Sequence, residues 1–377
     1  MTTLIFDHRP RLTWGGVRHW WDAVDRPLLA CAFFLIALGI VLNFATSPAL
    51  AARNGVDPFY YVTRQFIFAF PAIALMMGLS MASPKVIRRF GVVLFCLTIA
   101  LLMLVLLIGA SRNGSQRWLS FVFFSLQPSE LAKPALIAVS AWMFSVKDEP
   151  NAPPGAMVAA GCLALTAFLV ALQPDYSQTA LICAVWGIVF FLSGASIIWA
   201  ASGGLLAIGG GAIAYATSPY VAERLRLMVD LDSQSGYQMR KTVAAIREGG
   251  LWGTGPGEGI EKLGLPDAHS DFIIAVAAEE YGLILTLVVV AVYAFIVARG
   301  LLLAANLKSV FGRLAVSGVS ALIGFQAFIH IGVSARLLPP TGMTLPLVSY
   351  GGSSLMAMGV AFGMLLGLTR LDMERLR

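Results

Sequence analysis

Long apolar runs alternate with short polar segments along the whole chain. Each run is about 20 residues long, which a helix rising 1.5 Å per residue needs to cross roughly 30 Å of hydrocarbon. Charged residues, Pro or Gly bound the runs, as expected at helix ends. The pattern predicts an all-α, polytopic membrane protein. The ten expected transmembrane helices cover residues 27–46, 63–83, 90–110, 131–147, 156–173, 179–195, 198–216, 272–298, 313–334 and 352–370.

The distribution of basic residues predicts the orientation of these helices. Most Lys and Arg residues outside the spans share a side with the N-terminus, once the long segment 217–270 is discounted, because long loops carry little positive-inside signal. An even number of spans puts both ends on that side. We therefore expect a cytoplasmic segment 1–26, one membrane domain 27–370 and a cytoplasmic tail 371–377. The outer loops then cover residues 111–130, 217–271 and 335–351, and the largest of them joins the seventh and eighth helices.

Composition agrees with a membrane protein and excludes other classes. Hydrophobic residues make up 58% of the chain and charged residues only 12%, which excludes an ordinary soluble enzyme. The net charge of +6 arises from scattered Lys and Arg residues rather than a basic stripe, so nucleic acid is not an expected partner. The four cysteines lie in apolar runs and the four histidines lack close ligand spacing. Neither a protein-held metal site nor another cofactor is therefore predicted.

The first outer loop and the next short connection contain candidate binding residues. Arg117 and Lys133 would place positive charge near the membrane surface, where an anionic lipid headgroup sits. The simpler alternative is structural, with Ser129 as the N-cap of the following helix and Glu130 paired with Lys133 three residues on. Asp175 either caps the next helix or lines a polar cavity.

Three acidic residues mark the start of the eighth predicted helix. Asp271 stands at its mouth, where the helix N-terminus lowers the pKa of a carboxyl group and nearby hydrocarbon raises it. This combination suits a general base, whereas an exposed N-cap is the structural alternative. Glu279 and Glu280 lie two turns deeper, and carboxylates inside a span usually face a polar interior. Their expected partners are the basic residues Arg64, Lys133 or Arg336.

The last outer loop and a glycine-rich segment complete the set of motifs. Pro339, Pro340 and Pro346 forbid a regular helix, and non-helical backbone at membrane depth is tolerated only where protein or a cavity covers it. We expect a re-entrant lining there. The glycines of segment 253–259 do not form a phosphate-binding loop, since neither GxGxxG nor a following Lys-Ser or Lys-Thr is present.

Five segments together resemble one family of bacterial cell-wall proteins. They read QRWLSFVFFSLQPSELAK, LQPDYSQT, GTGPGEG, LPDAHSDFIIAVAAEEYG and LLPPTGMTLPLVSYGGSS. In this order, and over nearly the whole chain, they resemble the SEDS family (shape, elongation, division and sporulation), most closely its cell-division branch and then its elongation branch. The resemblance implies ten membrane spans and a peptidoglycan glycosyltransferase that polymerises lipid II. It also implies a class B penicillin-binding transpeptidase, with other division proteins, as partner.

The resemblance assigns roles residue by residue. Asp271 falls on the essential aspartate of the family, and the supporting carboxylates Glu279 and Glu280 follow in the same motif. The implied substrate-binding residues come from the first-loop motif and the final signature, and they are Arg117, Gln127, Ser129, Glu130, Lys133, Ser349, Tyr350 and Ser353.

The implied reaction joins two lipid-linked sugars. Asp271 would deprotonate the GlcNAc 4-hydroxyl of lipid II, which attacks the anomeric carbon of the growing strand, inverts it to a β-1,4 linkage and releases undecaprenyl pyrophosphate. Arg117 and Lys133, with Arg224, Arg226 and Arg240, would offset the diphosphate charge, a task that a divalent cation could share. The expected location is the bacterial inner membrane at the division septum. Three alternatives stay open: an elongation-type polymerase, a lipid II flippase or other transporter, and a non-catalytic scaffold.

Overall fold

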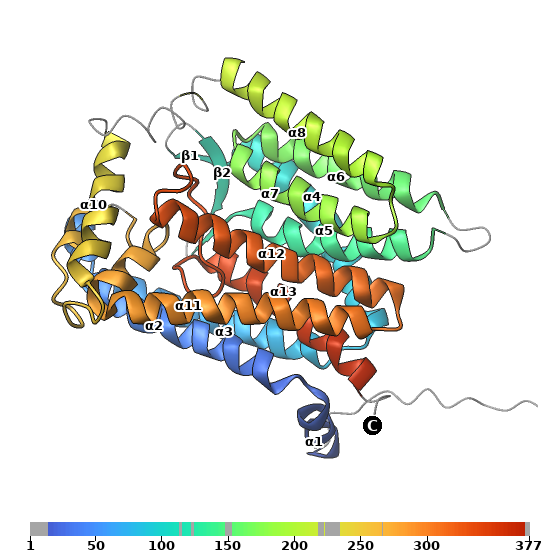
Figure 1. Ribbon diagram of the computed structural model, residues 1–377, viewed down its shortest axis with the longest axis horizontal. Helices are drawn as coiled ribbons and strands as arrows, with labels where there is room; N and C mark the ends of the chain where they lie inside the picture. Colours follow the sequence, from blue (N-terminus) through green and yellow to red (C-terminus); the bar gives the residue numbers. More distant parts are fainter. Residues whose placement is uncertain are drawn as a thin grey trace, which may run out of the picture.

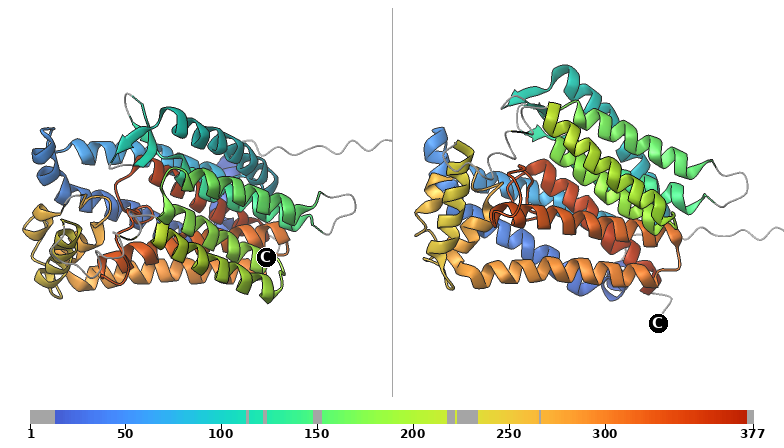
Figure 2. Two further views of the ribbon diagram at one scale, coloured as in Figure 1. Left: turned by 90° about the horizontal axis from the view of Figure 1, so that it is seen from above. Right: turned by 45° about the horizontal axis from the view of Figure 1, so that its top comes forward.

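The computed structural model describes residues 14–112, 115–121, 124–147, 153–217, 222, 234–265 and 267–373. Long helices run side by side through the molecule (Figures 1 and 2). Every segment predicted to span the membrane coincides with a helix. These helices are α2 (Arg26–Asn54), α3 (Tyr60–Ser80), α4 (Pro84–Ile108), α5 (Pro128–Ser145), α6 (Gly155–Ala171), α7 (Tyr176–Leu192), α8 (Ile197–Thr217), α11 (Ile273–Asn306), α12 (Val310–Ser334) and α13 (Gly352–Met373).

The polar segments contain further elements. They are α1 (Trp14–Ala23), α10 (Gln234–Gly249), the 3-10 helix η1 (Glu261–Gly264) and the strands β1 (Ala110–Arg112), β2 (Ser115–Ser120) and β3 (Ser125–Leu126). The strands form one antiparallel sheet in the order β1-β2-β3. The first predicted outer loop therefore contains strands, which no pattern in the sequence specifically predicted. The long outer loop does contain an amphipathic helix, α10.

The chain is a multi-pass membrane protein. Six helices are long and apolar enough to cross a bilayer, namely α2, α3, α4, α11, α12 and α13, while α6 and α7 are shorter apolar helices. Short polar residues start several of them: Asp25 Oδ1 accepts from the Leu28 N–H at 3.1 Å, and Ser309 Oγ accepts from the Gly312 N–H at 3.3 Å. Such side chains satisfy N–H groups that have no partner within the helix.

Helices α12 and α13 lie in the middle of the bundle (Figure 1), with α5 and α7 on one side and α3 and α11 on another. The most extensive contact between two helices joins α13 to α3. A Cβ added at Gly359, Gly363 or Gly367 would collide with the backbone of α3 at Ala72, Met76 or Leu79. This spacing of four residues is the small-residue pattern that lets two membrane helices approach closely.

The two ends of the bundle differ. Helix α1 and the end of α13 lie at one end, while α10 and η1 lie at the other, which we call the α10 end (Figure 1). Helix α11 runs the length of the molecule. Its 34 residues would extend about 50 Å at 1.5 Å per residue, more than a bilayer core requires.

Helix α11 is interrupted at Gly282, which adopts φ 80° and ψ −179°. The segment after α10 fills the interruption: the N–H groups of Leu283 and Ile284 donate to the carbonyls of Gly250 (2.9 Å) and Leu251 (3.3 Å). Only glycine readily adopts the conformation of Gly282, and a Cβ there would also collide with Leu251 and Gly253. The first two turns of α11 are thereby joined to the loop at the α10 end.

Candidate active site

Asp271 lies in the short loop between η1 and α11. The N–H groups of Ser270 and Asp271 both donate to the carbonyl of Asp267, at 3.0 and 2.9 Å, and Asp267 has the left-handed φ of 55°. The N-cap of α11 is Phe272, so Asp271 is not the cap that the structural alternative required. Its side chain is half-buried. Its Oδ2 faces Gly342 in the last outer loop, where a Cβ would lie 3.6 Å away.

Two outer loops meet directly beside this carboxylate. The N–H of Tyr350 donates to the carbonyl of His269 at 2.9 Å. The hydroxyl of Ser349 donates to the carbonyl of Ser270 at 2.6 Å and accepts from the N–H of Leu345 at 2.9 Å. Ser349, a predicted binding residue, therefore joins the two loops. The loop 335–351 contains no helix or strand and several of its side chains are buried; its re-entrant position in the membrane stays a prediction.

An aromatic cluster lies against the same junction. The ring centroids of Tyr61, His269 and Tyr350 are 4.9 to 5.5 Å apart. Burial raises the pKa of Tyr350, and nearby Arg64 opposes this shift. Burial lowers the pKa of His269 from 6.5 to about 4, so its ring is neutral at pH 7, and its Nδ1 has no hydrogen-bond partner. Arg64 also stacks on Tyr60, 4.8 Å from the ring centroid.

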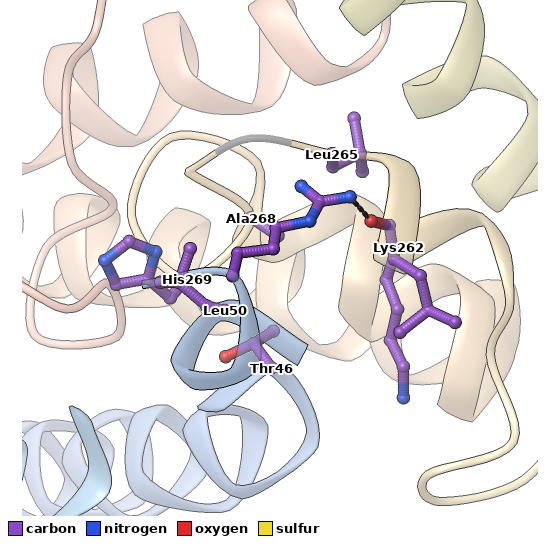
Figure 3. A pocket seen from close by; sticks show the side chains of 8 residues that line it. Thr46, Leu50, Lys262, Leu265, Ala268 and His269 are labelled. Carbon is purple, nitrogen blue, oxygen red and sulfur yellow. Dashed lines mark hydrogen bonds between the residues drawn. The ribbon is translucent and has the colours of Figure 1, made fainter. Parts of the chain in front are cut away.

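A small pocket lies behind the Asp271 loop, between the end of α2 and η1. Figure 3 shows Thr46 and Leu50 of α2 facing Lys262, Leu265 and His269. Arg53 crosses this pocket and donates to the carbonyl of Leu263. The end of α2 and the segment before Asp271 thus line the same pocket.

The first-loop cation Arg117 is held by the α6–α7 connection. Its Nη1 lies 3.4 Å from Asp175 Oδ1, and its guanidinium donates to the carbonyls of Gln173 and Pro174. Gln127 Nε2 donates to the other oxygen of Asp175 at 3.3 Å. Burial raises the pKa of Asp175, and Arg117 opposes the shift. The sequence suggested roles for both charged residues but did not indicate that they form a pair.

Lys133 is enclosed within the bundle. Its Nζ donates to Glu130 Oε2 (2.9 Å), Gln178 Oε1 (3.1 Å) and Gln326 Oε1 (2.9 Å). These contacts use all three N–H groups of the ammonium, and the Lys133 side chain is only 1% exposed. The predicted Glu130–Lys133 pair is therefore present. A phosphate could bind Lys133 only by displacing one of these acceptors.

The same network reaches the last outer loop. Gln326 Nε2 donates to the carbonyl of Thr344 at 3.0 Å, and the hydroxyls of Thr344 and Ser354 lie 2.6 Å apart. Ser353, the neighbouring signature residue, is buried. Ser129 is not a cap, since α5 begins at Pro128 with Gln127 as N-cap, and its buried hydroxyl has no partner.

The remaining candidates lie apart from Asp271 or outside the described residues. Glu279 and Glu280 are buried. Arg64, Lys133 or Arg336 was the predicted partner, but the cation that Glu280 contacts is Lys262. Arg240 is exposed on α10. Arg224 and Arg226 lie outside the described residues. Among the residues that the structure describes, no group of three His, Cys, Asp or Glu side chains could hold a metal ion.

The fold and this junction define a class of protein: a helical, multi-pass membrane protein whose polar motifs converge on loops at one end of the bundle. The FtsW/RodA/SpoVE family model, described as "Cell cycle protein", matches residues 25–374. The chain belongs to this family.

Curated relatives match over most of their length. The chain is 41% identical over 352 residues to a protein of Caulobacter vibrioides described as "Probable peptidoglycan glycosyltransferase FtsW", covering 93% of this chain and 90% of that one. It is 35% identical over 374 residues to a protein of the same description from Alkalilimnicola ehrlichii, covering 96% and 91%.

Solved structures share the fold. A chain from "Structural coordination of polymerization and crosslinking by a peptidoglycan synthase complex" is 27% identical, with a TM-score of 0.75 and coverage of 94% of this chain and 99% of that one. The rod shape determining protein RodA of Thermus thermophilus is 25% identical, with a TM-score of 0.67 and coverage of 93% and 98%.

Proposed function

We propose that this protein is a division-type peptidoglycan glycosyltransferase that polymerises lipid II, with Asp271 as its general base. The observation that carries the proposal is the position of Asp271. Its carboxylate is half-buried at the junction of two outer loops, at one end of a membrane-spanning bundle. A base there would meet a sugar whose lipid tail lies in the bilayer.

The chemistry needs one proton acceptor. Asp271 takes the proton of the GlcNAc 4-hydroxyl of lipid II as the oxygen attacks the anomeric carbon of the growing strand. The new β-1,4 bond forms with inversion, and the bond to undecaprenyl pyrophosphate breaks. No general acid is required, because the diphosphate leaves without being protonated. Glycoside hydrolysis, by contrast, employs a second carboxyl group.

The contacts divide the predicted binding residues into two groups. Arg117 and Lys133 already hold buried partners, so their charge acts on the diphosphate through the local field rather than by a new direct contact. Arg240 is exposed on α10, and we propose it as a residue that contacts the headgroup. Arg224 stays a candidate from the sequence.

The wider arrangement follows from the same assignment. Ten helices cross the inner membrane, both termini are cytoplasmic, and the α10 end faces outward. A class B penicillin-binding transpeptidase is the partner, and the division septum is the place of action. The similarity to a chain of a peptidoglycan synthase complex supports such a partner. Locating a tagged copy at midcell, rather than along the sidewall, would support the division role over the elongation role.

The decisive test is Asp271→Asn in the full chain, reconstituted in nanodiscs with fluorescent lipid II. We expect polymerisation to fall at least about 100-fold, the usual contribution of a general base, with unchanged folding. The control is Asp57→Asn, because Asp57 is an exposed carboxylate in the α2–α3 connection. Glycan synthesis at the normal rate by the Asp271 variant would refute the assignment. If the unmodified protein makes no polymer but translocates the headgroup when reconstituted in vesicles, it would be a flippase.

A further inference from the structure

Glu279 of α11 binds the start of the short helix η1. Its two carboxylate oxygens accept separately from the N–H groups of Glu261 (2.7 Å) and Lys262 (2.9 Å). The carboxylate therefore satisfies two main-chain donors at a helix start, where negative charge is stabilised. Gly259 leaves the necessary room, since a Cβ there would lie 2.8 Å from the Glu279 carboxyl carbon.

Glu280 binds the side chain of the same η1 residue. Lys262 Nζ donates to Glu280 Oε1, and the two side chains are 4% and 0% exposed. A buried pair of this kind depends on both partners, because removing one leaves an uncompensated charge in a low-dielectric environment. Glu279 and Glu280 of α11 thus both bind η1, a short segment of the preceding loop.

The main chain strengthens this connection. The N–H of Thr254 donates to the carbonyl of Glu279 at 2.8 Å, and the N–H of Gly255 donates to the carbonyl of Glu280 at 3.1 Å. These carbonyls lie just before the interruption at Gly282, where the regular hydrogen bonds within α11 are broken. The glycine-rich segment therefore docks on α11 rather than on a nucleotide.

These contacts close the loop that carries Asp271. Lys262 precedes Asp271 by nine residues and Glu279 follows it by eight. Joining both ends of a segment restricts the conformations of everything between them. The enclosed segment also buries Leu265, Ala268 and Phe272 in a small cluster with Ala245 and Val333, so the closed loop is packed against α10 and α12.

We propose that Lys262, Glu279 and Glu280 are positioning residues that hold Asp271 in its reactive place. The proposal rests on the function proposed above and deepens it. None of the three touches substrate; each acts through η1 and the loop. We name their contacts the η1 clasp. A clasp of this kind governs the rate of the chemical step, because a general base must stay within hydrogen-bond reach of the proton it accepts.

The test separates positioning from mere stability with a charge-neutral pair. Lys262→Met and Glu280→Gln each leave one buried charge and are expected to lower stability. The double variant has no buried charge at this position, so its stability should recover. Its side chains at positions 262 and 280 form no ion pair, however, so η1 is held less firmly. We expect kcat for lipid II polymerisation to fall about tenfold or more in the double variant, with KM within about twofold. Lys262→Arg should retain kcat.

The matched control is a second ion pair of η1, which joins Glu261 of η1 to Lys241 of α10. The charged atoms of Lys241 and Glu261 lie 2.7 Å apart, but their side chains are 31% and 24% exposed. Lys241→Met with Glu261→Gln removes this pair while keeping the Glu261 N–H that Glu279 binds. We expect kcat and KM to stay within error of the unmodified protein and stability to change by less than about 1 kcal/mol, since a partly exposed pair is screened by solvent and contributes far less than a buried one.

A second measurement does not depend on activity. Hydrogen exchange of the amides in 267–272 should speed up at least about tenfold in the neutral double variant and stay unchanged in the Lys241/Glu261 control. A stable double variant with normal kcat, or with normal exchange in this loop, would overturn the clasp. If the unmodified protein makes no polymer while exchange responds as expected, the proposed function fails and the clasp remains.

Discussion

Two polar regions at the α10 end are built in opposite ways. The first-loop cluster of Arg117, Glu130, Lys133 and Asp175 is sequestered, and its cations are surrounded by acceptors. The Asp271 loop instead presents a half-buried carboxylate between two loops. Charges that are already paired and buried cannot also serve as open ligands without losing those partners. We call the first-loop cluster the frame; it is enclosed, whereas the carboxylate of Asp271, the proposed general base, is more accessible.

The largest effect on the frame is expected from Lys133→Met. It leaves Glu130 as an unpaired buried carboxylate and should destabilise the fold by about 3–5 kcal/mol. Thermal unfolding of the purified protein, read by retained monomer on size-exclusion chromatography, measures this. Adding Glu130→Gln should recover much of the loss, because neither charge then remains. A Lys133→Met protein of normal stability that fails only in lipid II binding would show that Lys133 is a direct ligand, contrary to the frame.

The sequence predicted best what is local. Helix positions followed from apolar runs, and the Glu130–Lys133 pair followed from a spacing of three residues. The spacing of Gly359, Gly363 and Gly367 in the sequence also indicates that α13 approaches another helix closely. Each of these signals is contained within one helix.

The sequence failed where partners are brought together by tertiary structure. Arg117 meets Asp175 across 58 residues, and Lys262 meets Glu280 across 18 residues and an irregular loop. No periodicity connects such positions. Asp271 could be selected because it falls on the aspartate of a recognisable motif at the start of a long apolar helix, but its neighbours Gly342 and Ser349 come from a proline-rich loop. Only the folded chain identifies that loop as the other wall.

The Asp271 loop should be more sensitive to acid than the frame because of His269. Burial lowers the pKa of His269 from 6.5 to about 4, so the imidazole is harder to protonate in the folded state than in the unfolded state. The contribution of His269 to the free energy of unfolding is therefore constant above pH 6.5. As the pH falls from 6.5 towards 4, the unfolded state takes up the proton first and the free energy of unfolding falls by up to about 3 kcal/mol. Buried Asp175, whose pKa is raised, acts in the opposite direction. The difference in stability between the unmodified protein and His269→Gln therefore isolates the contribution of the histidine.

This prediction is checked by thermal unfolding between pH 4 and 7.5. The difference in stability between the two proteins should change steadily below pH 6.5 and be flat above it. His19→Gln serves as the control, because His19 is exposed on α1 at the opposite end of the bundle. A pH-independent difference for His269→Gln would mean that the ring is hydrated in solution rather than buried between Tyr61 and Tyr350.

The smallest of these effects tests the connection between the two regions. Gln326 accepts from Lys133 and donates to Thr344, so it joins the frame to the loop that packs on Asp271. Gln326→Leu leaves one Lys133 N–H and the Thr344 carbonyl without this partner, at a cost of about 1–3 kcal/mol. Because the change reaches the wall of the Asp271 site, kcat should fall more than stability alone explains. Gln116→Leu removes a side-chain hydrogen bond from β2 to the carbonyl of Gly109, just before β1, and should leave kcat unchanged. Equal kcat in both variants, measured per folded molecule, would mean that the frame and the Asp271 loop act independently.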